Sequence, residues 1–314
     1  MKKVTVEACA SSANLGSGFD VFAIALKEPV DRLTVSFRRG AVLRVDVGVP
    51  DGLGLPAEKR ENVAWVVAHE ACTEHGIRGD VEIKIEKKVP IGLGIGSSAA
   101  SAAACAVAVN TLFDLGLGLE ELLKLAGKGE GAVSGSVHYD NVSAAVCGGF
   151  VIVRAWPAPS VVRFEPPRWL RLCIATPDVK LPPRKTEYAR SILPKEVKLS
   201  AMSKAIAMAS TLVAGFATGD VEKIGEGMHD EVVEPVRSGL IPGYERVKKA
   251  AKRSGASGVC ISGAGPSVLA VVDSSRADPN VVLSSMLDCF RSAGVGASGF
   301  VTAAGKGARV VETG

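Results

Sequence analysis

A glycine-rich segment between a strand pattern and a helix pattern constrains this chain more than any other feature. The segment consists of Pro90, Ile91, Gly92, Leu93, Gly94, Ile95, Gly96, Ser97, Ser98, Ala99 and Ala100. Glycines at alternate positions let the backbone bend tightly and approach a ligand without a clash from Cβ atoms. A helix that begins at Ser97 would point its free N–H groups and the positive end of its dipole at this loop. The segment therefore predicts an anion-binding loop.

We compared three other interpretations of this segment with that of a loop that wraps the phosphates of ATP. A Walker-type loop is excluded, because no Gly-Lys-Ser or Gly-Lys-Thr follows the glycines. Residues 94–99 fit the dinucleotide pattern G-x-G-x-x-A, but residues 81–86 alternate apolar and charged side chains, whereas a central parallel strand is apolar on both faces. A plain helix entry with a serine cap would not need three glycines and two serines. We prefer the ATP loop of a small-molecule kinase and keep the dinucleotide and plain-cap interpretations as alternatives.

The length and the proline distribution predict two domains. A chain of 314 residues is longer than one core usually holds. Apolar residues make up 47% and aromatic residues 5%, which favours close helix–sheet packing in an α/β or α+β protein. Prolines at positions 157, 159, 166 and 167 indicate a linker. We therefore place the boundary near residue 160, between domains at 1–160 and 161–314.

Hydrophobic periodicity predicts mixed strands and helices in both halves. In the first half, strands are expected at 4–8, 33–37, 42–47, 81–86 and 150–154, and helices at 62–75, 97–110 and 119–126. In the second half, strands are expected at 170–175, 258–261, 268–272 and 298–302, and helices at 203–218, 221–233, 244–254 and 279–293. The second half then has the order β-α-β-β-α-β, which a ferredoxin-like half would show.

Charge and hydropathy exclude several classes of partner. The formal net charge is only +4 and the Lys and Arg residues are scattered, so binding to nucleic acid or to a membrane surface has little support. The N-terminus goes straight into a strand pattern, which does not resemble a signal peptide. We find no run of about 20 apolar residues without polar breaks, so we expect no membrane span and a cytoplasmic protein.

The seven cysteines are expected to be structural. None forms a Cys-x-x-Cys pair, so a structural zinc site is not predicted. Most lie within apolar strand or helix patterns, where a free cysteine packs as a small hydrophobic residue. Disulfide pairing cannot be derived from these positions.

Three motifs together resemble the GHMP kinases, which phosphorylate galactose, homoserine, mevalonate and phosphomevalonate. The first is the loop at 90–100, whose Pro-x-x-x-Gly-Ile-Gly-Ser-Ser-Ala is similar to the ATP loop of that family. The second is Ala-Ser-Ser-Ala-Asn-Leu-Gly-Ser-Gly-Phe-Asp at 10–20, and the third is Ile-Ser-Gly-Ala-Gly-Pro-Ser-Val at 261–268. The resemblance implies an α+β protein with the two-domain GHMP kinase fold, in which the third motif closes over the ATP loop.

Further segments resemble the homoserine kinases within that family. The sequence Ser-Ala-Asn-Leu-Gly-x-Gly-Phe-Asp replaces the Gly-Glu-His type of motif found in sugar and mevalonate kinases. Residues 137–142 are close to the His-Pro-Asp-Asn-Val of homoserine kinases, with Tyr139 in place of proline. Residues 186–194 and 234–243 resemble the same family. The resemblance implies transfer of the γ-phosphoryl group of ATP to L-homoserine, in threonine biosynthesis.

The resemblance also assigns site residues. Arg190 and Arg237 would hold the substrate carboxylate as guanidinium forks, and Asn14 and Asp20 would accept from its ammonium group. The expected catalytic residues and the remaining substrate contacts are His138, Asp140, Asn141, Thr186 and Gly263. A single arginine is more often on a helix surface, and a single histidine is more often structural. Here His138, Asp140 and Asn141 stand together, whereas the histidines at 69, 75 and 229 have no such neighbours.

The expected cofactors are ATP and Mg²⁺. Ser98 and Glu130 resemble the metal ligands of the family, although Glu130 would otherwise be taken for an exposed glutamate, and Asn62 resembles a position near the nucleotide base. Asn141 would orient the acceptor hydroxyl, and Asp140 is left between a weak base and a substrate contact. The alternatives are a GHMP kinase for another small alcohol, such as shikimate or mevalonate, and a non-catalytic ligand sensor of the same fold. Dimers are common in the family, so a homodimer is one expected form.

Overall fold

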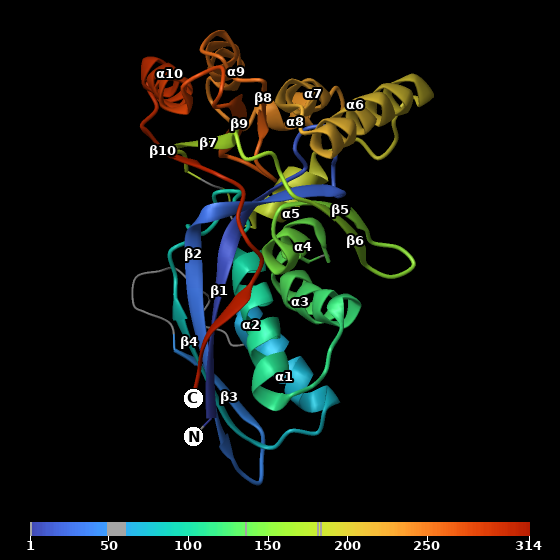
Figure 1. Cartoon of the computed structure of the whole chain (residues 1–314), viewed down its shortest axis with the longest axis vertical. Helices are drawn as coiled ribbons and strands as arrows, with labels where there is room; N and C mark the ends of the chain where they lie inside the picture. The colour runs from blue at the N-terminus through green and yellow to red at the C-terminus, as the bar shows by residue number, and fades with distance from the viewer. Residues whose placement is uncertain (1, 49–60, 136, 181, 183) are drawn as a thin grey trace.

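A seven-stranded sheet forms the lower half of the molecule (Figure 1). This computed structural model describes residues 2–48, 61–135, 137–180, 182 and 184–314. The strand order is β11-β1-β2-β4-β3, with β5 paired to β2 and β6 paired to β5. The bounds are β1 Lys2–Ala13, β2 Phe22–Arg39, β3 Arg44–Gly48, β4 Gly79–Glu86, β5 Phe150–Arg154, β6 Ser160–Phe164 and β11 Arg309–Thr313. Strand β4 has the alternation predicted from the sequence, with Val81, Ile83 and Ile85 buried.

Four helices lie on one side of this sheet, three of them against its strands and the third in chain order against the other helices (Figure 1). They are α1 Val63–Glu74, α2 Ser97–Phe113, α3 Leu119–Ser134 and α4 Asp140–Cys147. Helix α2 is buried over most of its length, as its run of alanines predicts, because small side chains let other helices and the sheet approach closely. Helix α4 was not predicted as an element, and only its first residues, Asp140 and Asn141, were singled out, together with His138.

A four-stranded antiparallel sheet forms the upper half, with the order β10-β7-β9-β8. Its strands are β7 Leu170–Pro177, β8 Gly258–Ile261, β9 Val268–Asp273 and β10 Ala297–Thr302. When these four strands are numbered 1 to 4 along the chain, their order across the sheet is 4-1-3-2. This is the arrangement of a ferredoxin-like half, so this prediction is confirmed. The helices are α5 Lys185–Ser191, α6 Leu199–Thr218, α7 Val221–Gly227, α8 Glu234–Ser238, α9 Tyr244–Arg253 and α10 Pro279–Ser292. The helix expected at 221–233 ends at Gly227, and α8 follows as a separate short helix.

The largest hydrophobic core spans both halves, and the second half has a further core of its own between its sheet and α9 and α10. Leu170, Leu172 and Ile174 of β7 belong to the same buried cluster as the first sheet. Phe150 of β5 stacks on Phe216 of α6 with ring centroids 3.8 Å apart. The C-terminal strand β11 also returns to pair with β1, so both termini lie at the same end of the sheet (Figure 1). The predicted boundary near residue 160 falls at the start of β6, which pairs with β5.

Helix α6 departs from an expectation of the sequence analysis. An 18-residue stretch within its 20 residues has a mean hydropathy of 1.4, and the helix is long and apolar enough to cross a membrane by length and composition. Its serine, threonine and lysine residues were counted as polar breaks, but alanine, methionine and branched side chains outweigh them. Length and composition alone do not establish a span. In this fold the helix packs against α7 and the core through one side, where Leu212, Gly215 and Phe216 are buried, and most of its other residues are exposed.

Candidate active site

The loop at residues 90–100, called the phosphate loop from here on, joins β4 to α2. Gly92, Gly94 and Gly96 have φ angles of 79°, 80° and 67°, in the left-handed region that favours glycine. A Cβ atom on Gly94 would lie 2.5 Å from the carbonyl oxygens of both Ser262 and Gly265. On Gly96 it would lie 2.1 Å from Ser11 Oγ. The glycines therefore allow close contact with the rest of the protein as well as a bend around a ligand.

The turn between β8 and β9, residues 262–267, packs directly on the phosphate loop. Ser262 Oγ donates to the Gly94 carbonyl at 2.8 Å, and the Ser267 N–H donates to the Leu93 carbonyl at 3.3 Å. The expectation that the third motif closes over the loop is thus confirmed. This contact joins the two sheets at the site.

A buried ion pair lies beneath the phosphate loop. Lys87 Nζ contacts Asp31 and also donates to the Ser97 carbonyl at 2.7 Å and to Ser101 Oγ at 3.0 Å. Burial lowers the pKa of Lys87, while the neighbouring Asp31 carboxylate opposes that effect. Asp31 also accepts from the backbone N–H groups of Lys88 and Val89, both at 2.8 Å. The pair therefore holds the strand end and the first turn of α2 together.

One cavity of about 290 Å³ opens above the phosphate loop. Its lining brings together segments that are far apart in the sequence: Ala13, Asn14, Asp20, Ile91, Gly92, Gly94, Gly96, Ser97, Ser98, Glu130, His138, Asp140, Asn141, Arg184, Lys185, Thr186, Arg190, Arg237, Gly263 and Ala264. All the predicted substrate, catalytic and metal-binding residues are in this set. Of the predicted nucleotide contacts, Pro90, Leu93, Ile95, Ala99, Ala100 and Asn62 are not.

Ser98 and Glu130 meet at one side of the cavity. Ser98 Oγ donates to Glu130 Oε1 at 3.0 Å, and burial raises the pKa of the Glu130 carboxyl, opposed by the Ser98 hydrogen bond and the charge of Lys87. Oxygen donors are the ligands that Mg²⁺ prefers, and this ion usually takes only one or two from the protein, beside substrate phosphates. Within the described ranges, no group of three His, Cys, Asp or Glu residues could hold a metal. The pair fits a magnesium ion that is bound mainly through phosphate.

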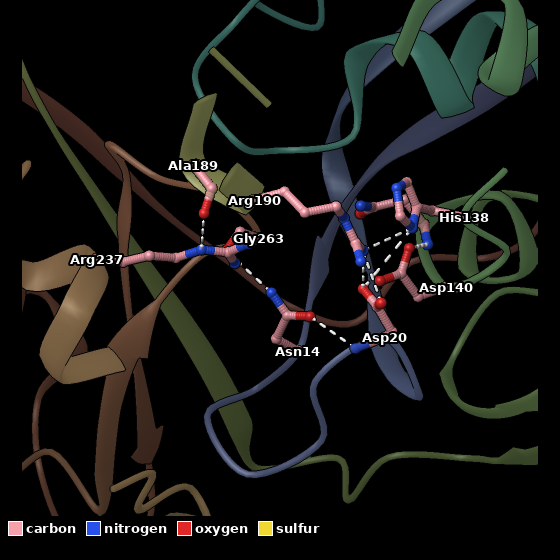
Figure 2. Close-up of polar contacts among 9 residues, drawn as sticks. Asn14, Asp20, His138, Asp140, Ala189, Arg190, Arg237 and Gly263 are labelled. Carbon is pink, nitrogen blue, oxygen red and sulfur yellow. Dashed lines mark hydrogen bonds and ion pairs between the residues drawn. The ribbon is translucent and has the colours of Figure 1, made fainter. Parts of the chain in front are cut away.

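Asp20, Arg190 and His138 form a polar network on another wall of the cavity (Figure 2). Arg190 Nη2 donates to Asp20 Oδ1 and Oδ2 at 2.8 and 2.6 Å, and it lies 3.0 Å from His138 Nδ1. Because a guanidinium group can only donate, Nδ1 accepts, and a neutral ring then carries its proton on Nε2. Burial lowers the pKa of His138, and the charge of Arg190 lowers it further. Both effects favour the neutral ring, while the negative charge of Asp20 opposes them.

Arg237, Asn14 and the Gly263 carbonyl form a second group beside it (Figure 2). Arg237 Nη1 donates to the Gly263 carbonyl at 3.1 Å, and its Nε donates to the Ala189 carbonyl at 3.2 Å. Asn14 Nδ2 donates to the same Gly263 carbonyl at 3.0 Å, while its Oδ1 accepts from the Asp20 N–H at 3.1 Å. Asn14 therefore helps to position its neighbours, and one of its two oxygen lone pairs is already used.

Asp140 and Asn141 begin helix α4 at the cavity wall. Asp140 is 4% exposed, and its Oδ1 accepts from the Asn141 N–H at 2.6 Å. Burial raises the pKa of Asp140 to about 7, although that backbone hydrogen bond opposes the shift. Ser11 Oγ donates to Asn141 Oδ1 at 2.8 Å, which leaves the Nδ2 hydrogens of Asn141 for the cavity. A titratable carboxyl and an oriented amide donor thus lie side by side.

Asn62 lies apart from this cavity. Its Oδ1 accepts from the N–H groups of Ala64 and Trp65 at 3.0 and 3.3 Å, so it is the N-cap of α1. Asn62 is 5% exposed. A contact with the nucleotide base stays a prediction for this residue, and the structure gives it a capping role.

Four charged residues of this region were missed by the sequence analysis. Arg184 and Lys185 line the cavity at the start of α5, directly before the predicted Thr186. Their only sequence signal is that position beside a motif. The sequence does not indicate the ion pair of Asp31 and Lys87. A lysine that follows a strand with alternating charged residues is expected to be exposed to solvent, and a single aspartate within a strand pattern indicates no partner.

Comparisons with known proteins give matches over nearly the whole chain. The sequence profile described as "GHMP kinases N terminal domain" matches residues 62–149, and "GHMP kinases C terminal" matches residues 212–284. A homoserine kinase from Natronomonas pharaonis is 40% identical over 310 residues, 98% of this chain and 99% of the relative. One from Thermoplasma acidophilum is 43% identical over 271 residues, 86% of this chain and 85% of the relative. The crystal structure of a homoserine kinase from Cytophaga hutchinsonii has a TM-score of 0.88 at 36% identity, covering 98% of this chain and 97% of that one.

Proposed function

The chain belongs to the homoserine kinase family of the GHMP kinases, and from this membership we propose that it transfers the γ-phosphoryl group of ATP to the side-chain hydroxyl of L-homoserine. The products are ADP and O-phospho-L-homoserine, an intermediate of threonine biosynthesis. One observation carries the proposal beyond family membership. The phosphate loop and the groups suited to an amino acid line the same cavity.

The amino-acid end of the substrate has complementary groups on one side of this cavity. Arg190 and Arg237 each present a guanidinium group there, and planar guanidinium forks match a carboxylate. Both cations also lie over the ring of Phe19, at 5.3 and 5.4 Å from its centroid, which holds their planes in place. Asp20 supplies the negative charge for the substrate ammonium group. Mevalonate has no ammonium group, so this arrangement favours homoserine over that alternative.

The phosphates of ATP are assigned to the phosphate loop. The N–H groups of Ser97, Ser98 and Ala99 begin α2 and have no partner within the helix, so they can donate to phosphate oxygens. Ser98 and Glu130 would hold Mg²⁺, which neutralises the charge of the phosphates when it is bound. The loop would place the γ-phosphorus in line with the acceptor hydroxyl, and positioning of this kind contributes roughly 7–11 kcal/mol to catalysis.

The acceptor hydroxyl is assigned to the start of α4. Asn141 Nδ2 would donate to the hydroxyl oxygen and so orient one of its lone pairs toward the γ-phosphorus. The adjacent Asp140, with a pKa raised by burial to about 7, is our candidate for the group that takes the hydroxyl proton. A base with a pKa near the operating pH is effective, and such catalysis contributes roughly 10²–10⁴-fold. His138, held neutral beside Arg190, would contact the substrate without carrying a charge.

The direct test is a substrate panel. The protein is incubated with ATP, Mg²⁺ and, in separate reactions, homoserine, shikimate, mevalonate or threonine, and the release of ADP is measured. We expect ADP release with homoserine only. Absence of homoserine-dependent ADP would overturn the assignment, and release with shikimate or mevalonate would select that alternative. ATP and homoserine binding without turnover would indicate the sensor.

The metal assignment is tested by Ser98→Ala. This variant should lower kcat by roughly 10²-fold and shift the Mg²⁺ dependence to higher concentration, since one of the two ligands is lost. Ser210→Ala on the exposed surface of α6 is the matched control and should leave both quantities unchanged. An unchanged Mg²⁺ titration of Ser98→Ala would remove this residue from the metal site.

The compartment and the oligomeric state complete the proposal. We propose a cytoplasmic enzyme that acts on small molecules alone, without nucleic-acid or membrane partners, as a homodimer. Size-exclusion chromatography with light scattering and cell fractionation test these points. A monomeric mass or a membrane fraction would contradict them.

A further inference from the structure

A lysine at the start of α5 lines the cavity but has no part in the mechanism above. Lys185 is half-buried, and its Nζ donates to the carbonyl of Gly265 in the turn between β8 and β9. That same carbonyl lies 2.5 Å from the position of a Cβ atom on Gly94. The ammonium group is therefore one hydrogen bond away from the backbone that packs on the phosphate loop.

The other buried or half-buried cations of this region are already bonded to protein groups. Arg190 contacts the Asp20 carboxylate, Arg237 donates to two backbone carbonyls, and Lys87 pairs with Asp31. In the part of the chain that the structure describes, no carboxylate lies within ion-pair distance of Lys185. An ammonium group has three donors, and the Gly265 carbonyl takes one. At least one donor is thus available to a ligand in the cavity.

The surroundings of Lys185 favour an anion as that ligand. Burial lowers the pKa of Lys185 to about 8, and the positive charge of Arg237 acts in the same direction. A cation in such a place is costly unless a negative charge joins it. The reaction brings the substrate carboxylate and the phosphates of ATP into this cavity, and of these phosphates the γ-phosphate meets the acceptor. The hydrogen bond of Lys185 to the turn on the phosphate loop places it with the phosphate.

We propose that Lys185 is a catalytic residue that binds the γ-phosphoryl group of ATP during its transfer to the acceptor. The inference rests on the proposed function and adds a protein cation to the phosphoryl site. Charge on the equatorial oxygens of the transferring group is stabilised by cations that approach from outside the phosphate loop. Lys185 makes no covalent bond and takes no proton in this role. Lys185 belongs to α5, in the second half of the chain, whereas the phosphate loop belongs to the first half.

The test compares Lys185→Met with Lys185→Arg and with the control Lys195→Met, which removes an exposed lysine just beyond α5. Binding of ADP and of the non-hydrolysable analogue AMPPNP is measured by calorimetry with Mg²⁺ present. We expect Lys185→Met to weaken AMPPNP at least tenfold and ADP less than twofold, because only AMPPNP has the γ-phosphate. Its kcat should fall roughly 10²-fold or more, with the KM for homoserine within threefold. Lys185→Arg should restore part of kcat, and Lys195→Met should behave as the wild type.

The outcomes separate this inference from the proposed function. Equal loss of ADP and AMPPNP affinity, or no loss of either, would overturn the γ-phosphate contact. A higher KM for homoserine with unchanged kcat would move Lys185 to the substrate carboxylate. Wild-type protein without homoserine-dependent ADP release would refute the proposed function, yet the comparison of ADP with AMPPNP would still decide the contact. Thermal unfolding of each variant shows whether the loss arises from a failure to fold.

Discussion

Asp140→Asn is the substitution whose effect the structure predicts most sharply. The carboxyl is 4% exposed, and burial raises its pKa from 3.8 to about 7. A shift of about three units corresponds to about 4 kcal/mol between the charged and neutral forms. Asparagine has nearly the same shape and keeps an oxygen to accept from the N–H of residue 141, but it carries no charge. The variant should therefore be more stable than the wild type wherever Asp140 is ionised.

The pH dependence has a definite sign. A raised carboxyl pKa means that the folded protein binds the proton more tightly than the unfolded chain. The wild-type free energy of unfolding should therefore lose this contribution as the pH rises from about 4 to about 7, and the loss should level off above 7. The difference between Asp140→Asn and the wild type should be near zero at pH 4 and approach an upper value of about 4 kcal/mol at pH 8. Urea unfolding followed by tryptophan fluorescence at several pH values measures it.

The same substitution, Asp140→Asn, should lower the activity although it raises the stability. If Asp140 takes the hydroxyl proton, Asp140→Asn should lower kcat by roughly 10²–10⁴-fold and remove a rise of kcat between pH 6 and 8. A stability difference that does not vary with pH would refute the buried ionisation. A variant that keeps the pH profile and only raises the KM for homoserine would make Asp140 a substrate contact instead of the base.

Two further predictions concern the phosphate loop. Gly94→Ala should abolish measurable ATP binding in calorimetry, because a Cβ at φ +80° would meet two carbonyl oxygens at 2.5 Å. The control Gly116→Ala has a similar φ but lies in open space, and it should bind ATP normally. Equal binding by both variants would contradict the steric argument. Lys87→Met should lower the free energy of unfolding by about 3–5 kcal/mol, because it leaves the buried Asp31 without its cation. A loss below 1 kcal/mol in urea unfolding would mean that the pair does not support the loop.

Local patterns account for what the sequence predicted correctly. Residues 81–86 alternate because β4 has one buried face, and the glycines at 92, 94 and 96 precede the start of a helix. The strand order of the second sheet followed from the β-α-β-β-α-β succession, because the crossover rules for that succession leave few arrangements. Each of these signals lies within a short stretch of chain. The resemblance to a family then supplied the residues of the site.

Contacts between distant segments were beyond the sequence. Strand β11 is short and exposed, and it was missed because its pairing with β1, at the other end of the chain, leaves no local pattern. The Lys87–Asp31 pair joins the residue after β4 to the middle of β2, and neither residue stands in an unusual pattern. Lys185 has meaning only through Gly265, which is 80 positions later. Periodicity describes which face of an element is buried, but it carries no information on which charged side chains meet there.

The Gly263 carbonyl explains why the site needs both sheets. It accepts from Asn14, which follows β1, and from Arg237, in the last turn of α8. The N–H of Gly263 donates to the Ala13 carbonyl at 3.2 Å. Asn14 in turn accepts from the backbone N–H of Asp20, and Asp20 contacts Arg190. The residues proposed to bind the substrate carboxylate and ammonium groups are therefore positioned through the Gly263 carbonyl, in the turn between β8 and β9. The same turn packs on Gly94, so the phosphate loop and the amino-acid pocket share one support, and a displacement of this turn would disturb both substrates together.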